Sequence, residues 1–309
     1  MLSAVTLVVR PQFSLHRWGC RPERAGWSPV ERPTGARLVL VRSGRFRRRG
    51  ADGPVDLDPT LGYIGMPGEE EHFAHPHGGD RCTSVQLSDA SWWQLVGEPG
   101  RVHSTVYVDA RTELAHRRLL SAAQSDIDYL LAEQLLDLVA GALHRAARRR
   151  TPVADRPVPA DQLLVERARA AIHDDHPAAR GLFPLAELLG TSPYRLSRAF
   201  PRELGVSLTT YRNRVRVSRA LDQLHRDTAT LADIAASLGF ADQAHFTRVV
   251  REHVGCTPAV LRRELCTLAA SGSRLKVQPD VQHPGRVGER THRQVVDSGA
   301  GVRRSVVKG

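Results

Sequence analysis

A short apolar pattern occurs twice in the second half of this 309-residue chain. The segment at 185–190 reads Leu-Ala-Glu-Leu-Leu-Gly, and the segment at 234–239 reads Ile-Ala-Ala-Ser-Leu-Gly. In both, apolar residues recur at helical spacing up to a glycine, the residue that most readily takes the left-handed conformation that ends a helix. An internal repeat of this kind predicts two copies of one supersecondary unit.

A second helix is expected directly after each segment. Ser192 can accept a hydrogen bond from a backbone N–H at a helix start, and Pro193 has the fixed φ that suits a first helical position. Residues 246–248 follow the second segment much as residues 196–198 follow the first, with one extra residue in the turn. Two helices joined by a short turn that contains Gly form a helix-turn-helix, whose second helix lies in the major groove of DNA. The repeat therefore predicts two such motifs.

The residues around the repeat resemble the DNA-binding domain of the AraC/XylS family of transcription regulators, over about 161–265. The match departs from the family pattern at Gly181, Pro184 and Gln223, none of which is a recognition residue. The resemblance implies a sequence-specific DNA-binding regulator that acts by binding, without catalytic residues. It rests on 181–200, Glu203, Leu204, Gly205, Val206, Ser207, Tyr211, Arg216, Ala220, Leu224, Ile234, Ala235, Gly239, Phe240, Phe246 and 255–258.

The C-terminal domain is predicted at 161–266 as an all-α unit in which a long helix joins the two motifs. Thr230 and Asp233 form a possible capping box at the start of the second motif. The long helix would measure roughly 28 Å, close to the ~34 Å between successive major-groove faces. The expected helices are 163–175, 182–189, 193–204, 207–225, 231–238, 242–253 and 258–265.

The resemblance also implies which side chains face DNA. Arg198 and Arg248 have the fork geometry that binds guanine O6 and N7, and each could hold a phosphate instead. Tyr194 could alternatively belong to the core. The expected contacts on the two recognition helices are Tyr194, Ser197, Arg198, Gln243, His245, Thr247 and Arg248. Arg195, Arg202, Arg212, Arg214 and Arg219 are candidates for the phosphate backbone.

The first half of the chain has short apolar runs separated by turn residues, which predicts a small all-β sandwich or barrel at 1–110. The clearest strand candidate is 38–41, with further runs near Val55, 61–64, 72–73 and 82–87. The stretch 37–89 resembles the cupin-type sensor domain of many AraC/XylS proteins. That resemblance rests on 44–46, 58–59, 67–69, 75–76 and 79–83, and it implies a domain that responds to a small-molecule effector.

Cupins can also be metalloenzymes, so the histidines of this stretch need a separate test. A cupin metal site uses two His in an HxH pattern, then a carboxylate and a later His. His75 and His77 are followed by Asp80 without a Glu at the expected step, and His72 lies outside the pattern. We therefore expect no metal, no cofactor and no catalytic residues, and keep a cupin-type metalloenzyme with an appended helical domain as the alternative. Four tryptophans could line a ligand pocket or belong to the core: Trp18, Trp27, Trp92 and Trp93.

The segment 111–150 changes to a helical period. Leu114, Leu119 and Ala122 indicate one helix, and Ser125 can cap a second helix with a wide apolar stripe between Ile127 and 143. The stripe can pack on the β domain of its own chain or hold a homodimer, and the resemblance favours the homodimer. Residues 151–160 are rich in proline and predict a linker, and 267–309 predict a disordered basic tail.

The whole chain is thus expected to be an α+β multi-domain protein: a cupin-like β barrel with a helical hairpin, then two helix-turn-helix motifs. A formal net charge of +11 favours an anionic partner. Four cysteines without a CxxC pair predict reduced thiols and a cytoplasmic protein, and no apolar run has the length of a membrane span. Double-stranded DNA, a homodimer, an effector and RNA polymerase are the expected partners. A non-specific basic nucleic-acid binder is a third possibility.

Overall fold

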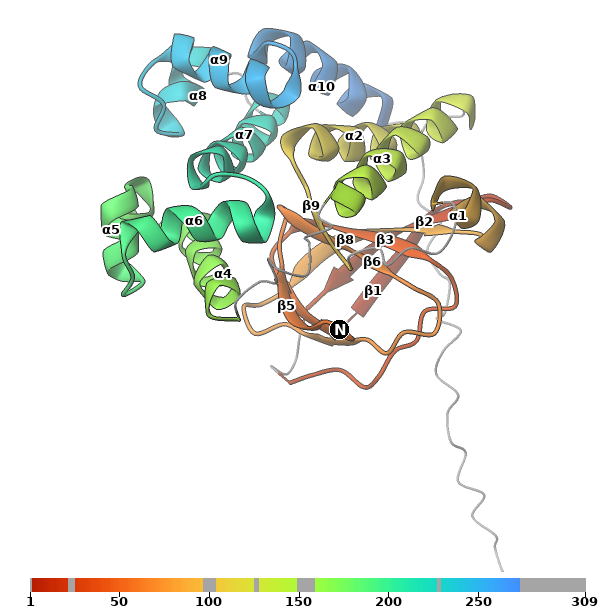
Figure 1. Ribbon diagram of the computed structural model, residues 1–309. Coiled ribbons are helices and arrows are strands. Elements are labelled where there is room, and N and C mark those ends of the chain that lie inside the picture. Colours follow the sequence, from red (N-terminus) through yellow and green to blue (C-terminus); the bar gives the residue numbers. More distant parts are fainter. Residues whose placement is uncertain are drawn as a thin grey trace, which may run out of the picture.

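The computed structural model describes residues 2–21, 26–96, 104–124, 128–148, 159–226 and 229–272. An N-terminal β domain carries two long helices across one side, and the C-terminal half is helical and lies against both (Figure 1). The expected α+β organisation is therefore confirmed. Ser125, Ile127, most of the predicted linker and residues 273–309 lie outside the described residues.

The described strands form two antiparallel sheets. A β domain in this part of the chain is what the short apolar runs separated by turn residues predict. The larger sheet has six strands in the order β1-β2-β8-β3-β6-β9, and the smaller has three in the order β5-β4-β7. Sequence reasoning did not single out β1, β2, β4 or β9 as strands. The bounds are β1 Leu2–Val9, β2 Phe13–Cys20, β3 Arg37–Ser43, β4 Phe46–Gly50, β5 Gly53–Leu57, β6 Leu61–Gly65, β7 His72–Ala74, β8 Asp80–Leu87 and β9 Thr105–Tyr107.

Three helices belong to the N-terminal half: α1 Asp89–Val96, α2 Ala110–Ala122 and α3 Asp128–Arg148. The Asp109 side chain accepts a hydrogen bond from the backbone N–H of Thr112 and caps α2. Helix α1 was not predicted. It places Trp92 in the core, where only 3% of the residue is exposed, whereas Trp93 is 46% exposed.

The apolar stripe of α3 packs on the β domain of its own chain. Its buried residues belong to the same core cluster as residues of β1, β2, β3 and β8. The structure thus bears out the first alternative for the buried stripe, packing on its own β domain, and a homodimer through α3 stays a prediction. Tyr129 and Leu136 remain exposed on α3, at 75% and 51%. The buried residues of α3 are Leu131, Leu135, Leu138, Val139, Ala142 and Ala146.

The C-terminal half follows the predicted order of helices closely. Ser192 accepts from the backbone N–H of Arg195 at the start of α6, and Thr230 and Asp233 form the expected capping box. Gly190 and Gly239 have the left-handed φ of +63° and +72° that their place after a helix requires. The bounds are α4 Pro159–His173, α5 Leu182–Leu188, α6 Pro193–Leu204, α7 Leu208–Arg226, α8 Leu231–Ser237, α9 Gln243–Val254 and α10 Pro258–Gly272, with a 3₁₀ turn at Pro177–Arg180.

Two expected boundaries move. Helix α4 begins at Pro159, so the last two residues of the predicted linker are helical. Helix α10 continues to Gly272, so the predicted tail cannot begin at 267. None of the described helices is long and apolar enough to cross a lipid bilayer.

The two halves of the chain are joined by buried charges. Arg214 of α7 is fully buried, and its Nη1 lies 2.8 Å from Oε2 of Glu113 in α2, as an ion pair rather than an aligned hydrogen bond. Its Nε donates to the carbonyl oxygen of Val108 at 2.8 Å. Arg169 of α4 donates to the carboxylate of Asp58 at 2.5 Å. The two halves are therefore packed against each other, although a linker is predicted between them.

Burial alone would raise the pKa of Glu113, but the guanidinium groups of Arg214 and then Arg117 lower it to about 2. Burial alone would also raise the pKa of Asp58. The positive charges of Arg169 and then His173 outweigh this effect, so that the pKa of Asp58 is well below its ordinary value. Both carboxylates are thus ionised in the folded protein at neutral pH. Each stabilises the fold above its unfolded-state pKa of about 4, and this contribution is lost as the pH falls toward the folded value.

Replacing Glu113 by Gln is expected to destabilise the protein, because Arg214 would remain buried without a counter-charge. Removal of one partner from a buried ion pair costs about 3–5 kcal/mol. The measurement is chemical denaturation at pH 7, with Glu187→Gln on the exposed side of α5 as the matched control. Equal denaturation midpoints for Glu113→Gln and the control would contradict this role of the pair.

Candidate nucleic-acid interface

Helix α6 presents a polar face to solvent. Tyr194 is 72% exposed, so the alternative that places it in the core is wrong. The exposed Arg198 lies one turn further on, with its guanidinium carbon 5.8 Å from the centre of the Tyr194 ring. Ser197 is half-buried, and its hydroxyl donates to the carbonyl oxygen of Tyr194 at 2.9 Å. The aromatic ring therefore supports the arginine through a cation–π contact.

Two further arginines of α6 are held by one carboxylate of α4. Arg195 Nε donates to Oδ1 of Asp161 at 3.0 Å, and Arg202 Nη1 lies 3.6 Å from Oδ2. The Asp161 side chain is 8% exposed, whereas those of Arg195 and Arg202 are 49% and 56% exposed. These arginines are anchored at one end and open to solvent at the other, as a phosphate contact would require.

Three arginines of α7 have partners inside the protein. Arg212 Nη2 donates to the carbonyl oxygen of Gly181 at 2.6 Å, at the start of α5. Burial and then the nearby Arg216 lower the pKa of Arg212. Arg219 binds Asp175 at 3.1 Å. Arg214 is fully buried against Glu113, so its expected role as a phosphate contact is wrong.

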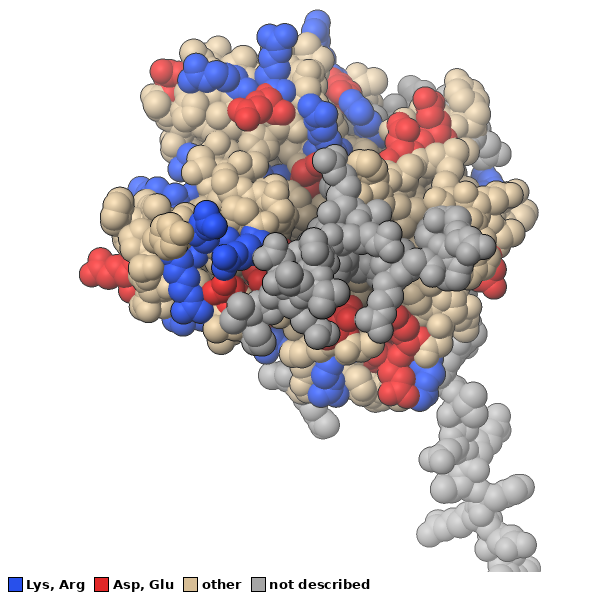
Figure 2. All heavy atoms as spheres, in the orientation of Figure 1, with Lys and Arg blue, Asp and Glu red and all other residues tan. Residues whose placement is uncertain are grey.

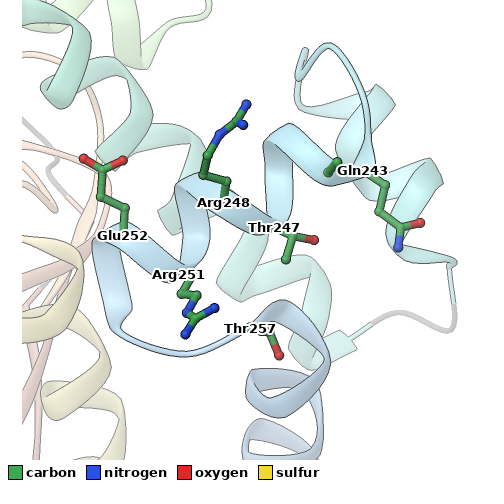
Figure 3. Close-up of a pocket in the computed structure, with 7 residues that line it drawn as sticks. Gln243, Thr247, Arg248, Arg251, Glu252 and Thr257 are labelled. Atoms are coloured by element: carbon green, nitrogen blue, oxygen red, sulfur yellow. The ribbon is translucent and has the colours of Figure 1, made fainter.

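A surface hollow of about 750 Å³ lies along the exposed side of α9 (Figure 3). Arg248 and Arg251 extend from α9 in different directions in this view, and Thr257 lies at the start of α10. Sequence reasoning missed Arg251, Glu252 and Thr257, although the four-residue step from Thr247 points to Arg251. The hollow is lined by Gln243, Ala244, Thr247, Arg248, Arg251, Glu252 and Thr257.

His245 has a different environment from the other predicted residues of α9. Its ring packs edge-on against Phe240, with centroids 5.5 Å apart. Its backbone N–H donates to the Asp242 side chain, which caps α9. His245 is half-buried and is not among the residues that line the hollow, and its contact with DNA stays a prediction.

The exposed cations of the described C-terminal helices gather in two places, over α6 and over α9 with α10 (Figure 2). Each place belongs to the second helix of one helix-turn-helix motif. The structure thus offers two separate basic surfaces on one helical unit, which is the arrangement that the sequence repeat predicts.

Among the described residues, His75 and His77 do not come together as the two histidine ligands of a metal site of the HxH type. The Nδ1 atom of His72 bonds with the carbonyl oxygen of Ser28 at 3.0 Å, while Nε2 of His75 lies 2.9 Å from Oδ1 of Asp80. Cys20 lies beside His75, so that Cys20, His75 and Asp80 are the described group whose ligating atoms come close enough to share a metal ion. His77 takes no part in this group.

Comparison with known proteins finds similar sequences for the C-terminal region. Residues 185–264 match the model of a helix-turn-helix domain. The arabinose operon regulatory protein of Escherichia coli K12 is 33% identical over 78 residues, which are 25% of this chain and 27% of that protein. The probable transcription factor PqrA of Proteus vulgaris is 35% identical over 78 residues, 25% of this chain and 64% of PqrA. The matched segment is thus less than two thirds of either relative.

A solved structure of ToxT from Vibrio cholerae, with an unsaturated fatty acid bound, aligns with 82% of this chain and 95% of ToxT. The identity is 9% and the TM-score is 0.35, values too low to support a functional argument. The family match and the curated relatives agree on the C-terminal region. Residues 185–264 are a helix-turn-helix domain, and the resemblance of this part of the chain to AraC/XylS regulators is confirmed.

Proposed function

We propose that the protein is a sequence-specific DNA-binding transcription regulator of AraC/XylS type. The observation that carries the proposal is the pair of solvent-exposed, arginine-bearing helices, α6 and α9, each the second helix of a helix-turn-helix motif. In this motif the second helix enters the major groove. Binding by both helices would place one chain across two major-groove segments.

Arg198 and Arg248 are the proposed base-reading residues. Both are exposed, and neither forms an ion pair with another residue of the described chain. An arginine with a free guanidinium can donate two hydrogen bonds to guanine O6 and N7, the commonest specific contact. Tyr194, Ser197, Gln243 and Thr247 lie beside them and complete the proposed interface. His245, next to the start of α9, is proposed as a further DNA contact of this helix.

Arg195 and Arg202 are proposed to hold phosphates, because Asp161 orients both while leaving them open to solvent. Arg212 is proposed to act mainly inside the protein, where its hydrogen bond to Gly181 fixes the start of α5. Arg251 and Thr257 line the hollow along α9 and are added as candidate backbone contacts. Phosphate contacts of this kind set the register of the protein on the duplex.

Replacing Arg198 or Arg248 by Ala is expected to weaken binding to a selected DNA site by about 1–3 kcal/mol and to relax base preference in one segment each. The measurement is selection from random duplexes by each purified variant, followed by titration at fixed salt. Arg111→Ala, an exposed arginine on α2, is the matched control and should keep both affinity and preference. Loss of affinity with unchanged preference in both variants would show that neither arginine reads sequence.

We further propose that two chains pair through the exposed face of α3 that carries Tyr129 and Leu136, since its buried stripe is already covered by the β domain. We also propose an effector that acts on the N-terminal half and a contact with RNA polymerase, both implied by the resemblance, and a place in the cytoplasm, which the scattered cysteines predict. The cavity between the larger sheet and α3 measures about 10 Å³, far below the ~300–1,000 Å³ of ligand pockets. Effector binding there would require the domain to open.

Replacing Tyr129 and Leu136 together by Glu is expected to give a monomer, because two carboxylates would be brought into an apolar contact. Sedimentation at micromolar concentration measures the state, and circular dichroism checks that the helices persist. Tyr129 and Leu136 are exposed in the single chain, so this variant should fold. A wild-type protein that sediments as a monomer would contradict the proposed pairing.

A further inference from the structure

Three side chains of the β domain converge at one end of the larger sheet. Cys20 ends β2 and lies opposite Asp80, the first residue of β8, in the antiparallel register. His75 precedes β8 in the chain and lies between them. Cys20 Sγ is 3.7 Å from His75 Nδ1, and His75 Nε2 is 2.9 Å from Asp80 Oδ1. One ligating atom of each residue lies within 4.8 Å of those of the other two.

A second thiol lies beside this group. Cys82 follows Asp80 by two residues in β8, and residues two apart in a strand point to the same face. Its Sγ lies 2.7 Å from Asp80 Oδ2, and the residue is 5% exposed. The thiol of Cys82 therefore contacts the group through the second oxygen of Asp80, and it is the nearby candidate for a fourth ligand beside Cys20, His75 and Asp80.

The backbone around the cluster is built for close approach. A Cβ atom on Gly79 would lie 2.4 Å from the carbonyl oxygen of Cys20, so only glycine lets the start of β8 lie against the end of β2. Gly44 has a φ of +76° and packs in turn on the backbone of Gly79. The ring of Phe46 lies 5.9 Å from that of His75. These contacts, together with the pairing of β2 and β8, hold Cys20, His75 and Asp80 close to one another.

The carboxylate of Asp80 has one buried oxygen atom that accepts no hydrogen bond. Its side chain is 4% exposed, and its Oδ1 has no hydrogen-bond partner of proper geometry, although His75 Nε2 lies at 2.9 Å. A buried polar atom without a partner costs free energy, and such atoms are rare in folded proteins. A cation between the carboxylate, the imidazole and the thiols would satisfy this oxygen.

We propose that Cys20, His75, Asp80 and Cys82 bind one Zn²⁺ ion. Zinc takes four ligands from Cys sulfur, His nitrogen and Asp oxygen in tetrahedral geometry, whereas Mg²⁺ and Ca²⁺ select oxygen ligands. Four protein ligands close the coordination sphere, which is typical of a structural ion rather than a catalytic one. Bound zinc ties the end of β2 to the start of β8. The site differs from the HxH arrangement, because His77 is not a ligand.

The test uses the purified full-length protein, stripped of metal with a chelator and kept reduced. Titration with Co²⁺ should give one ion per chain, with absorption bands from thiolate ligation and from tetrahedral cobalt. Zn²⁺ should displace the cobalt and abolish both. Zinc should also raise the thermal unfolding midpoint, because a ligand that binds only the folded state stabilises it. Absence of stoichiometric binding to folded protein would overturn the proposal.

Variants then assign the ligands. Cys20→Ser and His75→Ala should each weaken Zn²⁺ binding by at least about 10–100-fold, the loss known for residues that merely support metal ligands. Both positions are partly exposed, so these variants should fold, whereas Cys82→Ser changes the core. Cys256→Ser and His77→Ala are the matched controls and should bind as the wild type does. Unchanged binding in Cys20→Ser, or a Cys20–Cys82 disulfide in the purified protein, would overturn the proposal.

Discussion

The ion pair between Arg214 and Glu113 fixes the position of the longest described helix of the C-terminal half. Arg214 is fully buried in the middle of α7, which runs between the two helix-turn-helix motifs, and Glu113 belongs to α2 of the N-terminal half. A buried guanidinium tolerates little displacement from its carboxylate, because the charge would lose its partner in a medium of low dielectric. Arg169 and Asp58 repeat the arrangement between α4 and the β domain. The DNA-binding half is therefore held at two points by the domain that would sense an effector.

This constraint divides the arginines of the C-terminal half by role. Those on the inner side, such as Arg214 and Arg169, pair with carboxylates of the N-terminal half and are closed to solvent. Arg198 and Arg248 are exposed on α6 and α9, and the proposed function depends on them. A change in the N-terminal half that shifts α2 would move α7 and thereby both recognition helices. Regulation of DNA binding through this contact is consistent with the proposed role of the protein.

Local rules predicted most of the helices and several of the strands. The glycines at 190 and 239, the Ser192 cap and the Thr230 capping box each follow from backbone chemistry within a few residues, which is why the sequence reveals them. The burial of Arg214, the use of the α3 stripe by the β domain and the meeting of Cys20 with His75 depend on contacts between distant segments. The spacing of apolar residues along the chain does not indicate contacts of this kind. Helix α10 runs past the buried Leu265 to Gly272, an extension that composition alone does not indicate.

Hydroxyl-radical footprinting of the full-length protein on a DNA site selected by it tests the central claim most directly. If α6 and α9 both enter the major groove, one chain should protect two backbone segments on one face of the duplex, about one helical turn of ~10 base pairs apart. Failure to select any preferred site, or protection of a single segment by each chain, would contradict the account that two helix-turn-helix motifs read DNA together.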